Sequence, residues 1–355
     1  MKINLKQLDF AQLEEFFTSI GQSKYRAKQL FKWLYKKGAS SFDDMSDLSL
    51  KLREELKKTA YVSWLKLIEH KINKNKDTEK YLFETEDGNL IESVLIKYEE
   101  DLGVGRLTAC ISTQIGCALD CSFCATGKSG FIRNLEPYEI VDQILYIQNN
   151  LDENTERVGN VVLMGMGEPL LNYDNVIKAV KLINYPEGLS IGARHIAVST
   201  AGIVPGILKL ADEDMQIKLA ISLHTADDEK RSKIMPVNKK YPLKKLIDAV
   251  EKYQKKSGRR IMFEYALIKD FNDSKEDIIK LKDLVKDIDC VINIIPVNQI
   301  CGDKFIPPMP AEIKKIKEMM EDYGLKVTVR KSRGQDISGA CGQLAGKNKW
   351  LVAGD

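Results

Sequence analysis

The chain has 355 residues, of which 44% are hydrophobic and 30% charged, as is typical of a globular protein with a large core. Its formal net charge is only +3, which excludes any argument for a partner from bulk charge, so partner predictions depend on local clusters. No apolar run approaches the length of a membrane span, and residues 1–6 begin no apolar signal region. Seven cysteines without such a signal predict reduced thiols and a cytoplasmic location.

Residues 1–65 predict a small N-terminal helical accessory domain. One helix is indicated by an apolar stripe at i, i+3, i+4 and i+7, formed by Ala27, Leu30, Phe31 and Leu34. On its opposite side a lysine recurs at every fourth position, at Lys24, Lys28, Lys32 and Lys36. This row fits contact with an RNA backbone and equally fits a solvated face, and both readings stay open. A second short helix is expected from Asp43 to Leu56.

Residues 66–100 form a predicted β-rich connecting segment. Two strands, Lys80–Glu84 and Leu90–Ile96, flank the turn-like residues 86–89, which predicts a hairpin. Glu92 lies in the second of these strands.

From residue 101 to 300, apolar β-rich runs alternate with helical stretches such as Glu139–Gln148 and Leu243–Tyr253. The runs are Leu107–Ser112, Val161–Met164, His195–Ser199, Lys218–Leu223, Arg260–Leu267 and Val291–Val297. Six βα units predict a parallel sheet with right-handed crossovers. Because six units fall short of the eight in a closed barrel, we predict an α/β fold with a partial (β/α)6 barrel. Residues 301–355 form a C-terminal segment with one more strand-like run, Lys326–Arg330.

Three cysteines, Cys117, Cys121 and Cys124, lie on a short loop after the first run of the barrel. Their C-x3-C-x2-C spacing suits three thiolate ligands of a [4Fe–4S] cluster and leaves one iron open to an outside ligand such as S-adenosylmethionine. A structural zinc site needs four closed ligands, and a thioredoxin-like pair would leave Cys117 without a role. The spacing, with Phe123 before the third cysteine, resembles the radical-SAM superfamily signature.

Polar residues follow the later strands, at the ends where α/β barrels bind ligands. After the second run, the glycines of Gly165-Met166-Gly167-Glu168 predict close approach of the backbone to a ligand, and Glu168 can accept from an ammonium group. Other strand-end residues that could contact a ligand are Ser199, Thr200, Ser222, Leu223, His224 and Asn298. Each serine or asparagine alone would also suit a helix N-cap. We interpret His224 as a hydrogen-bonding contact rather than a metal ligand.

Four cysteines remain outside the cluster motif. Cys290 and Cys301 have no motif around them and are interpreted as structural. Cys110 precedes the cluster loop by seven residues. Cys341 is flanked by Gly339 and Gly342, which predicts a mobile loop that presents its thiol.

Three segments together resemble the RlmN family: Cys110–Gly127, the G-M-G-E-P-L stretch at 165–170, and D-I-S-G-A-C-G-Q-L at 336–344. The resemblance covers nearly the whole chain and implies a radical-SAM enzyme that methylates C2 of adenosine in large-subunit (23S) ribosomal RNA and in transfer RNA. It implies a [4Fe–4S] cluster on Cys117, Cys121 and Cys124. It also implies S-adenosylmethionine contacts at Gly167, Glu168, Ser199, Ser222, Leu223, His224 and Asn298.

The resemblance also implies a mechanism that consumes two molecules of S-adenosylmethionine per turnover. One methylates the thiolate of Cys341, and a second is cleaved at the cluster to a radical that takes hydrogen from the S-methyl group. The S-methylene radical adds to adenine C2 and forms a protein–RNA crosslink. Loss of the C2 proton, with Glu92 as the implied acceptor, and attack of Cys110 on the Cys341 sulfur release the base and leave a disulfide.

Substrate and partner predictions are coarser. Candidate phosphate contacts, each of which could also be a plain surface charge, are Lys239, Lys240, Lys326, Arg330, Lys331 and Arg333. The target base must leave its stack to enter the barrel. We expect a reducing partner such as flavodoxin or ferredoxin, no membrane, and a monomer.

Two other functions compete with this reading. A Cfr-like enzyme would use the same cysteines to methylate C8 of adenosine, but Pro169 after Glu168 resembles the C2 branch. The second alternative is a non-catalytic iron–sulfur module that binds RNA.

Overall fold

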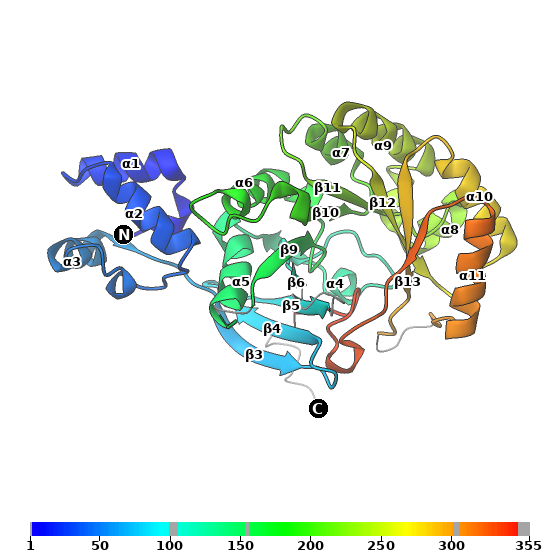
Figure 1. Ribbon diagram of the computed structural model, residues 1–355, viewed down its shortest axis with the longest axis horizontal. Helices are drawn as coiled ribbons and strands as arrows, with labels where there is room; N and C mark the ends of the chain where they lie inside the picture. The colour runs from blue at the N-terminus through cyan, green and yellow to red at the C-terminus, as the bar shows by residue number, and fades with distance from the viewer. Residues whose placement is uncertain (1, 99–105, 153–155, 301–304, 347–355) are drawn as a thin grey trace.

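The computed structural model describes residues 2–98, 106–152, 156–300 and 305–346, and its larger part is organised by one ten-stranded sheet (Figure 1). The strand order is β14-β13-β12-β11-β10-β9-β6-β5-β4-β3. Within the described residues, all neighbours from β6 to β14 are parallel and all neighbours from β3 to β6 are antiparallel. The bounds are β3 (Lys66–Ile72), β4 (Thr78–Glu84), β5 (Leu90–Tyr98), β6 (Arg106–Cys110), β9 (Val158–Leu163), β10 (Ile196–Thr200), β11 (Lys218–Ser222), β12 (Ile261–Leu267), β13 (Cys290–Pro296) and β14 (Val327–Val329).

The parallel strands curve into a partial barrel with helices on its outside (Figure 1), which confirms the predicted fold class. The covering helices are α5 (Pro137–Asn149), α6 (Tyr173–Asn184), α7 (Val204–Leu210), α8 (Asp228–Ile234), α9 (Leu243–Ser257), α10 (Lys275–Val285) and α11 (Pro310–Asp322). Side chains alternate along each strand, so one set packs under the helices and the other faces the lumen. In β12, for example, Phe263 and Tyr265 are fully buried, whereas Met262 and Glu264 line the lumen.

Local sequence signals explain where several helices begin and end. The side chain of Ser274 accepts a hydrogen bond from the backbone N–H of Asp277, and the side chain of Asp277 accepts one from the backbone N–H of Ser274. The two bonds form a capping box at the start of α10. Helix α9 ends at Gly258, whose φ of 67° is left-handed and favours glycine.

The antiparallel strands are the main difference from the expected connecting segment. The predicted hairpin is confirmed as β4 and β5, and Glu92 lies in β5 as expected. However, β5 also pairs with β6, and β3 adds a strand that was not predicted, so this segment extends the barrel sheet. The sequence of β3 gave little signal because the strand lies at the sheet edge and most of its residues are exposed. The run 326–330 becomes β14, which pairs in parallel with β13.

The N-terminal residues form helices α1 (Phe10–Ser19), α2 (Tyr25–Tyr35) and α3 (Leu50–Thr59), with a two-stranded pair of β1 (Ile3–Asn4) and β2 (Ala60–Tyr61). The predicted stripe of α2 is buried throughout. The helix expected from Asp43 to Leu56 was wrong in its start. Residues 42–44 form a 3-10 turn capped by Ser41, and α3 begins only after the cap at Ser49. Serine hydroxyls at both positions compete for the helix start.

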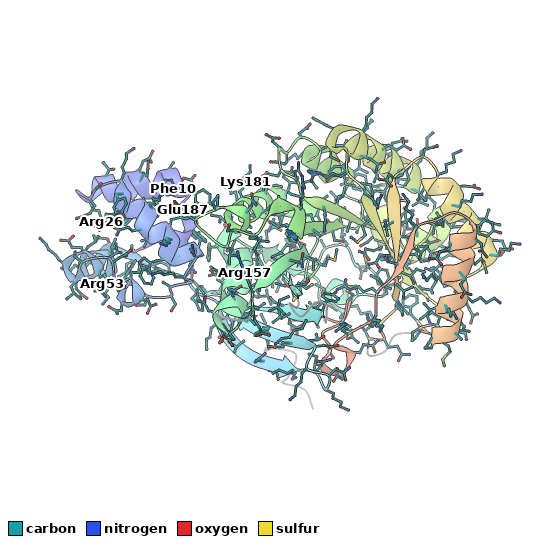
Figure 2. All side chains as sticks on the ribbon, viewed as in Figure 1. Phe10, Arg26, Arg53, Arg157, Lys181 and Glu187 are labelled. Atoms are coloured by element: carbon teal, nitrogen blue, oxygen red, sulfur yellow. The ribbon has the colours of Figure 1, made fainter. Side chains whose placement is uncertain are left out.

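This helical part contacts the barrel through α6 and the loop that follows it. Phe10 and Phe31 pack against Tyr185, with ring centroids 6.5 and 4.9 Å from it, and Lys28 pairs with Glu187 at 2.7 Å. Figure 2 shows Phe10 and Glu187 close together at this boundary, with Arg26 and Arg53 on the far side. A second lysine of the predicted row, Lys24, pairs with Glu14, so acids neutralise part of that row.

A buried ion pair joins the helical part to the barrel. Lys6 Nζ lies 2.6 Å from Asp142 Oδ1 of α5, and neither side chain is exposed. Burial lowers the pKa of Lys6 and raises that of Asp142 to about 6, so desolvation outweighs the mutual attraction for both partners.

We expect Lys6→Met to lower the free energy of unfolding by about 3–5 kcal/mol at neutral pH, since it leaves a buried carboxylate without its counter-ion. A carboxyl whose pKa is higher in the folded protein than in the unfolded chain does not lower the free energy of unfolding when the pH is below the unfolded-state pKa. The free energy of unfolding then falls as pH rises toward the folded-state pKa. Loss of Lys6 raises the pKa of Asp142 further, so the deficit relative to wild type should shrink as pH falls toward about 6 and stay small below it, where both proteins carry a protonated Asp142. Denaturant unfolding at several pH values measures this. Lys51→Met, on the exposed face of α3, is the control, and a deficit independent of pH would contradict the argument.

Among the described residues, no helix combines the length and the apolar composition that crossing a bilayer requires.

Candidate active site

The three motif cysteines lie between a small hairpin and a short helix at the carboxyl end of β6. The hairpin pairs β7 (Gln114–Gly116) with β8 (Phe131–Asn134), and the helix is α4 (Ala125–Lys128). Gly116 has φ 72°, and a Cβ there would overlap the carbonyl oxygen of Gly130, so only glycine fits. The same carbonyl accepts from the N–H of Cys117 at 2.8 Å, which fixes the start of the loop. The N–H of Cys124 donates to the carbonyl of Cys121 at 3.0 Å and closes it.

The donor set suits a group larger than one metal ion. All three cysteines line one cavity, called here the cofactor cavity, which Glu168, Ser199 and His224 also line. Within the described residues, no three Cys, His, Asp or Glu side chains converge closely enough for a single ion. A four-iron cube is wider and holds its thiolates further apart. Burial raises the pKa of Cys117 to about 12 and that of Cys121 well above its usual value. Iron ligation would stabilise the thiolates.

Glu168 follows β9 and is almost fully buried in the cofactor cavity. Its Oε1 accepts from the N–H of Leu170 at 3.0 Å, and Oε2 accepts from the N–H of Ala201 at 2.7 Å. Burial raises the pKa of this carboxyl to about 7, against the opposing effect of these hydrogen bonds. An ammonium group beside it would favour the charged form, so a fixed Glu168 fits the amine of S-adenosylmethionine.

The glycines before Glu168 have a packing role in addition to the ligand contact that the sequence predicts. Both Gly165 and Gly167 line the cofactor cavity. However, a Cβ on Gly165 would lie 2.7 Å from the carbonyl carbon of Ile111, and one on Gly167 would lie 2.5 Å from Cβ of Gln114. Close packing against the loop after β6 therefore already requires glycine, before any ligand is considered.

His224 lines the cofactor cavity in a left-handed conformation, with φ 61°. The N–H of Ala266 donates to its Nδ1 at 2.9 Å, and burial, with the nearby Arg231, lowers its pKa to about 3. The ring is therefore neutral, and its Nε2 carries the proton and can donate to a ligand. This geometry agrees with the hydrogen-bonding contact expected from the sequence.

The other predicted contacts divide into two groups. Ser199, Ser222 and Asn298 line the cofactor cavity, whereas the side chain of Leu223 is fully buried and does not. Leu223 instead acts through its backbone, since its carbonyl accepts from Arg231. Arg231 has no exposed surface and also donates to the carbonyls of Ala201 and Ser222, so it ties together the ends of β10 and β11. The sequence did not single out this arginine.

A second cavity, called here the thiol cavity, contains both lone cysteines. It is lined by Cys110, Cys341, Cys124, Met164 and Arg330. Burial raises the pKa of Cys110 to about 12, and the charge of a Cys341 thiolate adds to this. The pKa of Arg330 is raised, chiefly by Cys341, so its guanidinium supplies positive charge to the cavity. Because Cys341 and Cys124 line both cavities, the two cavities are neighbours. The six cysteines of the described ranges are all free thiols, and Cys301 lies outside those ranges.

The loop that carries Cys341 is held in place at several points. The side chain of Asn298 donates to the carbonyl of Cys341 at 3.0 Å. The carbonyl of Gly342 accepts from the N–H of Ala125, and the carbonyl of Leu344 accepts from the hydroxyl of Thr126. These bonds place the thiol beside α4 and the cysteine loop. Asn298 therefore positions Cys341, a role that the sequence did not indicate.

Glu92 lies near this loop but not on the wall of either cavity. Its Oε1 accepts from Lys80 Nζ at 3.1 Å, and its Oε2 accepts from the N–H groups of Ala345 and Gly346 at 2.8 and 3.3 Å. In this arrangement the carboxylate holds the C-terminal segment and is already hydrogen-bonded at both oxygens.

The candidate phosphate contacts lie in three kinds of environment: in ion pairs, on the wall of the thiol cavity, and exposed on the surface. Lys326 pairs with Asp289, and Arg333 pairs with Asp77 and lies over the ring of Tyr98. Lys331 lines the thiol cavity together with Arg330, whereas Lys239 and Lys240 are exposed on the surface.

Comparison with known proteins agrees with this geometry. Residues 111–281 match the radical SAM superfamily model, and residues 3–62 match the ribosomal RNA large subunit methyltransferase N-terminal domain. A radical SAM methyltransferase from Sphaerobacter thermophilus has a crystal structure that aligns with a TM-score of 0.92 and 40% identity, over 97% of this chain and 100% of that one. The chain is 48% identical to a probable dual-specificity RNA methyltransferase RlmN of Thermoanaerobacter sp. (strain X514), over 97% of this chain and 98% of that protein. It is 46% identical to the protein of the same name in Caldanaerobacter subterraneus, over 99% of both.

A partial barrel with a three-cysteine loop at the carboxyl end of its first strand defines a radical-SAM protein, whose cofactors are a [4Fe–4S] cluster and S-adenosylmethionine. Sequence identity of 46–48% to curated relatives over nearly the full chain identifies the family within this superfamily. The chain belongs to the RlmN family.

Proposed function

We propose that this protein is a radical-SAM RNA methyltransferase that transfers a methyl group to C2 of adenosine in large-subunit (23S) ribosomal RNA and in transfer RNA, by way of Cys341. The observation that carries the proposal is the place of Cys341, which lines both the cofactor cavity and the thiol cavity. A thiol in this position can receive a methyl group from the cofactor cavity and pass it on to a bound nucleobase. Cys110, on the wall of the thiol cavity, is within reach of the charge on Cys341.

The cofactors are held by residues of the cofactor cavity in this proposal. Cys117, Cys121 and Cys124 hold the cluster, and Glu168 with His224 holds S-adenosylmethionine, with further contacts from Gly167, Ser199, Ser222 and Asn298. Leu223 is proposed to contact S-adenosylmethionine through its backbone, whose carbonyl accepts from Arg231. When bound, cluster and S-adenosylmethionine supply a carbon-centred radical that can take hydrogen from a methyl group.

The chain itself supplies two thiols and a carboxylate that acts as a proton acceptor. Cys341 carries the methyl group, two S-adenosylmethionine molecules being consumed per turnover, and Cys110 resolves the covalent adduct by attack on sulfur. Glu92 is the proposed acceptor of the C2 proton. Its bonds to Ala345 and Gly346 would have to open for that task, so movement of the C-terminal segment is part of this assignment.

The choice of C2 over the C8 position of a Cfr-like enzyme is supported by the proline of Glu168-Pro169-Leu170. Pro169 is buried and begins a 3-10 turn that orients Glu168.

The accessory domain of residues 1–65 and the connecting segment of 66–100 are proposed to flank the barrel of 101–300, with the methyl-carrier loop in 301–355. We further propose that the protein is a monomer in the cytoplasm, where the Cys110–Cys341 pair can be returned to thiols, and that flavodoxin or ferredoxin reduces the cluster.

Anaerobic incubation with S-adenosylmethionine, a reductant and RNA, followed by nucleoside mass spectrometry, tests the function. We expect 2-methyladenosine and 5′-deoxyadenosine from the wild-type protein. Cys124→Ala should lose iron and acid-labile sulfide and give neither product. The matched control is Cys290→Ala, at a buried thiol outside both cavities, which should keep both. Formation of 8-methyladenosine would support the Cfr-like alternative, and RNA binding without 5′-deoxyadenosine would support the non-catalytic one.

A further inference from the structure

The amino-terminal half of the barrel lumen contains a third cavity, called here the lumen cavity. It encloses about 760 Å³, compared with about 180 Å³ for the cofactor cavity. Lumen-facing residues of successive strands line it, including Asn160 and Val162 of β9, Met262 and Glu264 of β12, and Asn293 of β13. Closed α/β barrels fill this region with layers of side chains. The open lumen of this partial barrel therefore has room for a ligand.

The lumen cavity adjoins the reaction site. Met164 and Arg330 line the lumen, cofactor and thiol cavities alike, and Glu264 lines the lumen and cofactor cavities. A group in the lumen cavity would thus lie next to the side chains that surround Cys341.

The lumen cavity carries a strong positive charge. Its lining includes Arg194, Lys218, Arg259, Arg260 and Arg330, and Glu264 is the single acid among the described residues of that lining. Arg194 and Lys218 are exposed, and Arg260 pairs with Asp289 at 3.1 Å. Exposed arginine and lysine at the entrance of a polar cavity suit the phosphates of a nucleotide.

Among the described residues that line this cavity, Glu264 alone has a buried side-chain oxygen without a hydrogen-bond partner. It is 4% exposed, and its Oε2 accepts from Nδ2 of Asn293 at 2.8 Å, while Oδ1 of Asn293 accepts from the hydroxyl of Thr328. Its Oε1 is buried and has no hydrogen-bond donor within the described residues. Burial raises the pKa of Glu264 and the charge of Arg330 opposes that rise, although no ion pair within 4.0 Å joins the two described side chains, so a donating ligand would favour the carboxylate form. A buried acceptor without a donor is costly, so its presence indicates a ligand that donates to it.

We propose that the lumen cavity receives the target nucleotide and that Oε1 of Glu264 accepts a hydrogen bond from the exocyclic amino group of adenine. This inference rests on the proposed function and adds a specificity-determining residue to it. Adenine carries an exocyclic amino group that can donate to the carboxylate. Guanine and uracil carry a carbonyl oxygen in the corresponding place, and its lone pairs would repel those of the carboxylate. Asn293 and Thr328 fix the carboxylate, so the site is formed before the base arrives.

A donor on S-adenosylmethionine is the competing partner, because Glu264 also lines the cofactor cavity. The two partners make opposite predictions for a substrate that lacks only the amino group. We therefore compare an RNA fragment that the protein methylates with the same fragment carrying purine riboside at the target position.

Equilibrium binding of both RNAs to anaerobic, cluster-loaded protein is the measurement. We expect the wild type to bind the adenosine RNA about 10- to 100-fold more tightly, the range for a hydrogen bond to a charged group. Glu264→Ala should bind the two RNAs with equal affinity, while its iron content and its affinity for S-adenosylmethionine stay within about twofold of wild type. Glu251→Ala, at an exposed position of α9, is the matched control and should keep the full discrimination. Glu264→Met keeps a similar side-chain volume without an oxygen acceptor, should also bind the two RNAs with equal affinity, and replaces the alanine variant if that variant does not fold.

Three results would overturn the inference, and they differ from one another. Equal binding of the two RNAs by the wild type would show that the amino group is not recognised. A loss of S-adenosylmethionine affinity in Glu264→Ala, with discrimination retained, would assign the carboxylate to the cofactor. Failure of the wild type to methylate adenosine in any RNA would instead refute the proposed function, and the inference with it.

Discussion

Cys341→Ala is expected to abolish RNA methylation, with a fall of at least about 10⁴-fold, as for removal of a covalent nucleophile. Among the described cysteines outside the cluster motif, Cys341 alone lines both the cofactor cavity and the thiol cavity, and the thiol cavity also contains Cys110. Arg330 lines the same cavity and supplies positive charge next to Cys341. Alanine leaves the loop bonds of residues 341–344 intact, because they are made by backbone carbonyls.

The experiment uses S-adenosylmethionine with a deuterated methyl group. Intact-protein mass spectrometry should show one added methyl group on the wild type and none on Cys341→Ala, and RNA nucleosides should carry the label only with the wild type. Iron and sulfide content should be equal in the two proteins. The Cys290→Ala control should take up the methyl group. If Cys341→Ala still methylates RNA, the carrier role is refuted.

Much of the fold could be predicted because burial leaves a plain mark on the sequence. Each apolar run of the barrel became a parallel strand, since strands covered by helices on one side and lumen on the other read as apolar stretches. Strand β3 escaped prediction because an exposed edge strand carries no such pattern. The start of α3 was wrong because Ser41 and Ser49 are both good caps, and only packing decides between them.

The site was predictable where its residues form a local motif and unpredictable where they meet across the fold. The three motif cysteines lie on one short loop, so spacing alone identified them. Arg231 and Asn298 act by hydrogen bonds to backbone carbonyls far along the chain, and no local pattern indicates those partners. Glu264 did leave a signal, a charged residue in the middle of the apolar strand Ile261–Leu267, which is unusual unless the strand lines a polar lumen.

The glycines before Glu168 show the limit of reasoning from composition. Glycine next to a strand end was associated with close approach of a ligand, and the structure adds a second group, the loop of residues 111–114, that already lies against both glycines. Gly167→Ala would therefore disturb the loop of residues 111–114 as well as any ligand, so a loss of cofactor binding in that variant would not by itself identify Gly167 as a cofactor contact.

Cys110→Ala is expected to accumulate a covalent protein–RNA adduct and to lose turnover by at least about 10³-fold. The proposed adduct links Sγ of Cys341 to C2 of adenine through one carbon, and it ends when a thiolate attacks Sγ. That attack forms the sulfur–sulfur bond and breaks the sulfur–carbon bond. The electron pair stays with carbon, which takes a proton to become the methyl group. Among the described cysteines, Cys110 alone shares the thiol cavity with Cys341 without belonging to the cluster motif.

Burial raises the pKa of Cys110 to about 12, so its thiol is inert until a base or a shift of charge removes the proton. This protects Cys341 from premature disulfide formation, and it makes resolution depend on Arg330, whose charge opposes the effect of burial. The adduct should appear on a denaturing gel as a slower protein band that ribonuclease removes. It should be absent from the Cys110→Ala/Cys341→Ala double variant and from Cys290→Ala. Normal turnover by Cys110→Ala would remove this thiol from the mechanism, because a solvent thiol cannot readily reach a sulfur on the wall of that cavity.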